Sequence, residues 1–116
     1  MTVRRLKTYT GETGYVYQYY FVGQRNALSS PAIEYIFDVS NDRKTTFAVS
    51  VFLLDSAVAD WEQQHGRKLV DAERYASAKM RLFRAFDEIE NLMQEGRQLT
   101  IGTEEMEALL ATLGVD

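Results

Sequence analysis

Residues 34–54 read EYIFDVSNDRKTTFAVSVFLL, two alternating stretches separated by a short polar segment. Aromatic and β-branched side chains recur at every second position, which favours two strands with one strongly apolar face. These apolar positions are Tyr35, Phe37, Val39, Phe47, Val49, Val51 and Leu53. The segment NDRK between the stretches has the composition of a tight turn. Strands joined by so short a connection must be antiparallel.

The preceding stretch, residues 14–25, reads GYVYQYYFVGQR and predicts another strand over 15–24. Its Tyr, Val and Phe side chains fit a pleated, half-buried surface. A weaker strand is predicted over 3–9, and the glycines of TGETG at 10–14 are typical of a turn. Together with residues 34–54, these segments predict an antiparallel four-stranded meander.

The second half of the chain has the apolar spacing of helices. The sequence predicts a short helix that ends at Gly66, a long helix over 72–95, and a last helix after Thr103. The stripe of the long helix contains Tyr75, Ala76, Leu82, Phe83, Phe86, Ile89 and Met93. QLTI at 98–101 is either a short fifth strand or an extended linker. Strands first and helices after predict one α+β domain over 1–116, with three helices packed on one face of the sheet.

Composition limits the class of protein. The 116 residues are 46 % hydrophobic and 26 % charged, contain no cysteine, and carry a net charge of −4. This acidic balance does not favour nucleic-acid binding, because it repels phosphate backbones. No apolar run approaches the roughly 20 residues that span a bilayer, and no signal peptide is visible. We therefore expect a cytoplasmic domain with no membrane partner.

No motif predicts a catalytic residue, a cofactor or a metal. His65 is the single histidine, and EQQH at 62–65 lacks the second motif that a di-iron site needs. Glu34 and Asp38 share a strand face but would lie roughly 13 Å apart, too far for a glycosidase pair. GETG at 11–14 precedes a strand and is interpreted as a hairpin turn. We expect a non-catalytic domain, with His65 near a helix end.

The tyrosines of the second strand fall on both of its faces. Alternation divides Tyr15, Tyr17, Tyr19 and Phe21 from Val16, Tyr20 and Val22, and does not say which set is buried. Whichever set faces outward, Ile36 and Phe52 add to its apolar surface. A covering segment, a protein contact or a ligand pocket would each explain such a surface. The candidate interface or ligand residues are Tyr15, Tyr17, Tyr19, Tyr20, Ile36 and Phe52.

Two hypotheses for function follow. The first is protein–protein contact through this aromatic face, with a second copy of the chain (a homodimer) as one partner. The second is a small-ligand-binding domain or enzyme with a pocket between sheet and helices. Candidate polar groups for that pocket are Tyr17, Tyr19, Arg25, Asp38 and His65.

Overall fold

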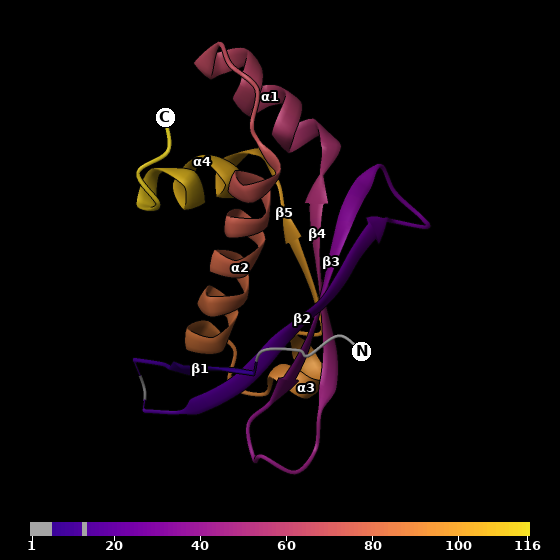
Figure 1. Cartoon of the computed structure of the whole chain (residues 1–116), viewed down its shortest axis with the longest axis vertical. Coiled ribbons are helices and arrows are strands. Elements are labelled where there is room, and N and C mark those ends of the chain that lie inside the picture. Colours follow the sequence, from indigo (N-terminus) through magenta and orange to yellow (C-terminus); the bar gives the residue numbers. More distant parts are fainter. Residues whose placement is uncertain (1–5, 13) are drawn as a thin grey trace.

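A computed structural model describes residues 6–12 and 14–116. It has the predicted α+β architecture, with one sheet of strand order β1-β2-β3-β4-β5 and helices packed against it (Figure 1). The elements are β1 Lys7–Thr10, β2 Val16–Asn26, β3 Ala32–Ser40, β4 Phe47–Leu54, α1 Asp55–His65, α2 Asp71–Glu88, α3 Leu92–Glu95, β5 Gln98–Ile101 and α4 Thr103–Thr112. Residues 3–5 of the first predicted strand and Thr13 of the predicted turn lie outside the described residues.

Strands β1 to β4 form the predicted antiparallel meander, and β5 joins the edge of β4 in parallel. The N–H of Ser50 donates to the carbonyl of Arg97 at 2.8 Å, which aligns β5 with β4. QLTI is therefore a strand. Because α2 and α3 lie between β4 and β5 in the chain, the connection is long enough to permit parallel pairing.

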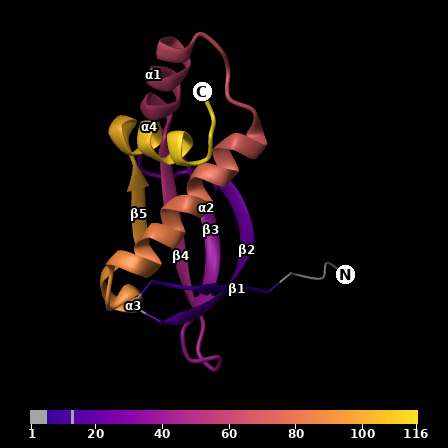
Figure 2. The same ribbon diagram turned by 90° about the vertical axis from the view of Figure 1, so that its left-hand side faces the viewer.

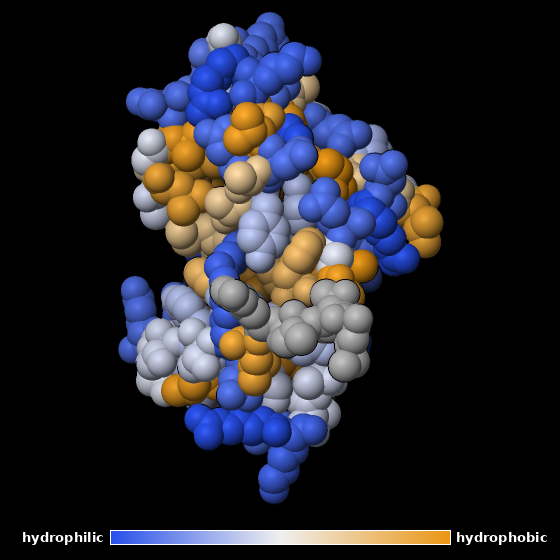
Figure 3. Space-filling view, in the orientation of Figure 1, coloured by the Kyte–Doolittle hydropathy of each residue, from blue (hydrophilic) through white to orange (hydrophobic). Residues whose placement is uncertain are grey.

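The β3–β4 turn is held by one aspartate. The Oδ1 atom of Asp42 accepts the N–H groups of Lys44 and Thr45, both at 2.8 Å. An aspartate that bonds its own following backbone in this way is a turn former. The turn residues 41–46 are all exposed and make a hydrophilic projection at the bottom of the molecule (Figure 3).

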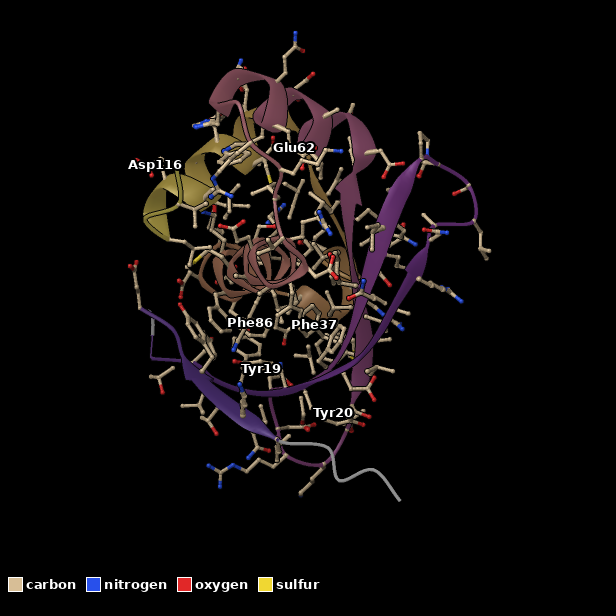
Figure 4. The ribbon with its side chains drawn as sticks, turned by 45° about the horizontal axis from the view of Figure 1, so that its top comes forward. Tyr19, Tyr20, Phe37, Glu62, Phe86 and Asp116 are labelled. Atoms are coloured by element: carbon tan, nitrogen blue, oxygen red, sulfur yellow. The ribbon has the colours of Figure 1, made fainter. Side chains whose placement is uncertain are left out.

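The core lies between one face of the sheet, the inner face, and helices α1, α2 and α4 (Figure 2). Tyr17 and Tyr19 of β2 both contact Phe86 of α2. Figure 4 shows Tyr19 on the side of Phe86 and Tyr20 on the other side of the strand. The ring of Tyr17 stacks on Phe86 of α2 with centroids 4.3 Å apart and planes 6° apart. Aromatic packing between β2 and α2 thus fixes which face of the tyrosine strand is buried.

The long helix ends earlier than predicted. Helix α2 stops at Glu88, Ile89 is extended at φ −107° and ψ 111°, and the single turn α3 follows. The prediction of a continuous helix over 72–95 is therefore wrong at its C-terminal end. In a continuous helix Met93 would share the face of Phe86, and Leu92 would share the face of the buried Ala85, so both would border the core. After the break only one of the two is buried, since Leu92 is 2 % exposed and Met93 is 44 % exposed.

Strand β2 contains a bulge between Phe21 and Gly23. Phe21 pairs with Phe37, and Gly23 already pairs with Ile36, so Val22 is an extra residue. A bulge shifts the alternation of every residue that follows it. Arg25, which strict alternation would place with Tyr17 and Tyr19, consequently lies on the face opposite the helices.

Candidate functional site

The six predicted site residues are divided between the two faces of the sheet. Tyr17 and Tyr19 are 3 % and 4 % exposed and belong to the core. Tyr20, Ile36 and Phe52 are half-buried on the opposite face. Tyr15 precedes β2 and is 60 % exposed. Only Tyr20, Ile36 and Phe52 therefore remain as candidates for one shared surface.

We call the sheet surface opposite α1, α2 and α4 the outer face. Its side chains are contributed by strands β2 to β5 and alternate with those of the core. Two rows of cross-strand neighbours make up its centre, Gly23–Ile36–Ser50–Gln98 and Arg25–Glu34–Phe52–Thr100. Each row mixes apolar and polar side chains. The outer face is therefore an amphipathic surface rather than a second core.

Glu34 is the most enclosed charged side chain of the outer face. Its side chain is 9 % exposed, its Oε1 accepts the Nε–H of Arg25 at 2.9 Å, and its Oε2 accepts the hydroxyl of Ser50 at 2.6 Å. The hydrogen bond from Arg25, followed by that from Ser50, lowers the pKa of Glu34 below its ordinary value, although burial opposes this. Glu34 is therefore held as a fixed carboxylate.

Tyr20 and Asp38 form a second ordered polar pair on the same face. They are cross-strand partners, and the Tyr20 hydroxyl donates to the Oδ2 of Asp38 at 2.6 Å. A hydroxyl bond to a carboxylate is charge-assisted and stronger than a neutral bond. The ring of Tyr20 is consequently held across the strands, beside the half-buried Ile36.

A hollow of about 600 Å³ lies at the β4–β5 side of the outer face. It is lined by Ala48, Ser50, Gln94, Glu95, Arg97 and Gln98. The Nε–H of Arg97 donates to the carbonyl of Ala48 at 3.1 Å, which fixes the guanidinium at the rim. The hollow widens the polar border of the outer face toward α3.

The polar groups expected for an internal pocket do not converge. Tyr17 and Tyr19 lie in the core, Arg25 and Asp38 lie on the outer face, and His65 lies near the end of α1. The His65 ring stacks on Trp61 with centroids 4.1 Å apart, and its Nε2 lies 3.0 Å from an oxygen of Glu107. The structure therefore places His65 at the end of α1 in contact with Glu107 of α4. The sequence does not predict its contacts with Trp61 and Glu107.

The pair of Arg25 and Glu34 was also not found from the sequence. From the sequence, Glu34 is considered only together with Asp38, and Arg25 is considered only as a polar group of a pocket between sheet and helices. One signal was available, because an isolated glycine within a strand pattern, here Gly23, often marks a bulge. A bulge at that position predicts that Arg25 changes face.

No protein-family model, curated protein or solved structure matches the chain. In residues 6–12 and 14–116, no helix combines the length and the apolar character that a membrane crossing requires. Within the same residues, no three His, Cys, Asp or Glu side chains are grouped so that they could hold a metal ion.

Proposed function

We propose that this chain is a non-catalytic protein-interaction domain that binds a second copy of itself through the outer face. The observation that carries the proposal is the set of fixed charges beside half-buried apolar side chains. Glu34 is held by Arg25 and Ser50, and Ile36 and Phe52 lie next to them. Polar groups that are already ordered lose little side-chain entropy when a partner covers them.

The residue types of the outer face fit a protein contact. Tyrosine and arginine are enriched at interfaces, and Tyr20 and Arg25 stand at its β2 side. The Arg25 side chain remains 54 % exposed although its Nε–H is bonded to Glu34, so its other N–H groups can reach a partner. Arginine presents five such donors in a rigid fork, which suits it to a carboxylate across an interface.

A second copy is favoured because the outer face carries both signs of charge. In a two-fold contact the same surface meets itself, so each charged group must find its opposite on that surface. Arg25 and Asp38 lie on the same face and can exchange partners across the two-fold axis. A face of a single sign would repel its own copy.

Light scattering after gel filtration, over a range of concentrations, tests this proposal. We expect the mass of two chains for the wild type and of one chain for Ile36→Lys, which places an ammonium between Glu34 and Asp38. Val70→Lys is the matched control, because Val70 is 57 % exposed in the loop before α2. It should leave the mass unchanged.

The proposal would be contradicted if the wild type had the mass of one chain at every concentration and did not bind to a column that carries the immobilised chain. If Ile36→Lys and Val70→Lys both lost the dimer, the added charge itself, and not a change of the outer face, would explain the loss.

A further inference from the structure

A hollow of about 220 Å³ lies on the other side of the sheet, between the start of β2 and the end of α2. It is lined by Tyr15, Tyr17, Phe86, Asp87, Glu88, Ile89 and Glu90. Its volume is below the roughly 300–1,000 Å³ of pockets for drug-sized ligands. It has room for one side-chain-sized group.

The wall of this hollow combines aromatic rings with carboxylates and contains no Lys or Arg. Tyr17 stacks on Phe86, which fixes both rings, and Tyr15 stands exposed at the rim. Asp87, Glu88 and Glu90 supply three carboxylates. Aromatic faces and carboxylates both attract cations, the first through the ring quadrupole and the second through full charge.

The carboxylate of Asp87 is fixed from the side of β1. Its Oδ2 accepts the hydroxyl of Tyr9 at 2.7 Å, and its Oδ1 accepts the N–H of Glu12 at 3.1 Å. The bond to Asp87 raises the pKa of Tyr9 to about 12, so this hydroxyl remains a donor. Asp87 therefore anchors the β1–β2 arm to α2 and gives the hollow a rigid wall.

Glu88 and Glu90, the two other acidic side chains of the hollow, are not paired with a cation of the described chain. Within the described residues, Glu88 and Glu90 form no ion pair, and both are exposed. Arg84 lies four residues before Glu88 on α2, and the two form no ion pair. The charge of Glu88 and Glu90 remains available to a ligand.

The hydroxyl of Tyr17 is a second observation that points to a ligand. The residue is 3 % exposed, it lines the hollow, and its hydroxyl has no hydrogen-bond partner among the described residues. Burial, with smaller effects from Tyr15 and Asp87, raises the pKa of Tyr17, so the hydroxyl stays neutral. The hydroxyl oxygen is not fully enclosed, so it can accept from a donor placed in the hollow.

We propose that this hollow binds an organic cation, an alkylammonium or guanidinium group, on the rings of Tyr15 and Tyr17 and the carboxylates of Glu88 and Glu90. The cation lies in the ring-lined space, donates to the Tyr17 hydroxyl oxygen, and is neutralised by the two acids. The group is either part of a free amine or the side chain of a lysine or arginine in another protein.

The test is an amide NMR titration of the whole chain with n-butylammonium chloride. We expect saturable shifts at residues 86–90, and none with n-butanol or with sodium chloride at equal ionic strength. The double variant Glu88→Gln/Glu90→Gln should bind about fivefold more weakly, as the loss of two exposed ion pairs implies. Glu104→Gln/Glu105→Gln is the control, because it removes the same charge from exposed positions of α4.

A second titration uses a Gly-Ser peptide with one central lysine. Saturable binding of either probe supports the cation site, and the tighter probe identifies the source of the cation. Equal responses to butanol and butylammonium would overturn the proposal, as would an unchanged affinity in Glu88→Gln/Glu90→Gln. The outer face lies on the opposite side of the sheet, so dimerisation and cation binding can fail separately.

Discussion

Replacement of Phe86 by alanine tests how α2 is held on the sheet. Phe86 is 2 % exposed, and its ring lies within 4.3 Å of Tyr17, 5.4 Å of Tyr9 and 6.0 Å of Tyr19, centroid to centroid. The substitution removes one ring from a cluster that joins β1, β2 and α2. The three tyrosines cannot close the space, because their positions are fixed by strand pairing.

The expected cost has three parts. Burial of a phenylalanine side chain contributes about 1.5–3 kcal/mol. Its stacked pair with Tyr17 contributes about 0.5–1.5 kcal/mol beyond the buried area. The remaining cavity adds to this, because the surrounding rings relax only partly. We therefore expect Phe86→Ala to lower the free energy of unfolding by about 3–5 kcal/mol, the range measured for such core truncations.

Urea unfolding followed by circular dichroism measures this loss as a shift of the midpoint at constant slope. Met93→Ala is the matched control, because Met93 belongs to the same predicted stripe but is 44 % exposed. Its loss should stay within about 0.5 kcal/mol. A loss below about 1 kcal/mol in Phe86→Ala, or equal losses in the two variants, would refute this account of the core.

Three further predictions concern the helix ends. His65→Ala should cost about 1 kcal/mol in urea unfolding, because it removes the stack on Trp61, whereas a freely solvated histidine would cost nothing. The hydrogen bond from Arg67 lowers the pKa of Glu73 from 4.5 to about 2. The ionised carboxylate of Glu73 therefore stabilises the fold fully above pH 4.5, and this contribution is lost as the pH falls toward 2. The free energy of unfolding of Glu73→Gln should consequently depend less on pH between 2 and 4.5 than that of the wild type. Identical pH profiles of the two proteins would contradict the role of the Arg67–Glu73 ion pair. Gly66→Ala should lower the free energy of unfolding by about 1–2 kcal/mol in the same assay, because the φ angle of Gly66 is 67°, which strains a residue with a side chain. A Cβ at this position meets no other atom, so backbone strain is the only cost. An unchanged free energy would mean that α1 ends in a different conformation.

The sheet could be predicted from the sequence because its alternation is strict where one face is buried. Phe37, Val39, Val49 and Val51 are all fully buried, as the pattern of 34–54 predicts. The end of α2 could not be predicted in the same way. A helical stripe continues through Met93 in the sequence, and only the pairing of β5 with β4, a tertiary contact, shows that the helix must stop.

The candidate site was predictable only in part. Ile36 and Phe52 lie on the expected strand face, since no bulge interrupts β3 or β4. Which tyrosines of β2 are buried is decided by their contact with Phe86 of α2. This is a tertiary contact, and the alternation of the sequence does not predict it. The face of Arg25 depended on the bulge before it. One extra residue in a strand therefore decides whether Arg25 joins the core tyrosines or neutralises Glu34.

A dilution series of amide NMR spectra tests the central claim most directly, because it locates the contact as well as detecting it. If the outer face binds a second copy, amides of β3 and β4 should shift with concentration along one binding curve, and those of α1 and α4 should not. Concentration-dependent shifts confined to the helices, or spectra that do not change with concentration, would contradict the proposed contact.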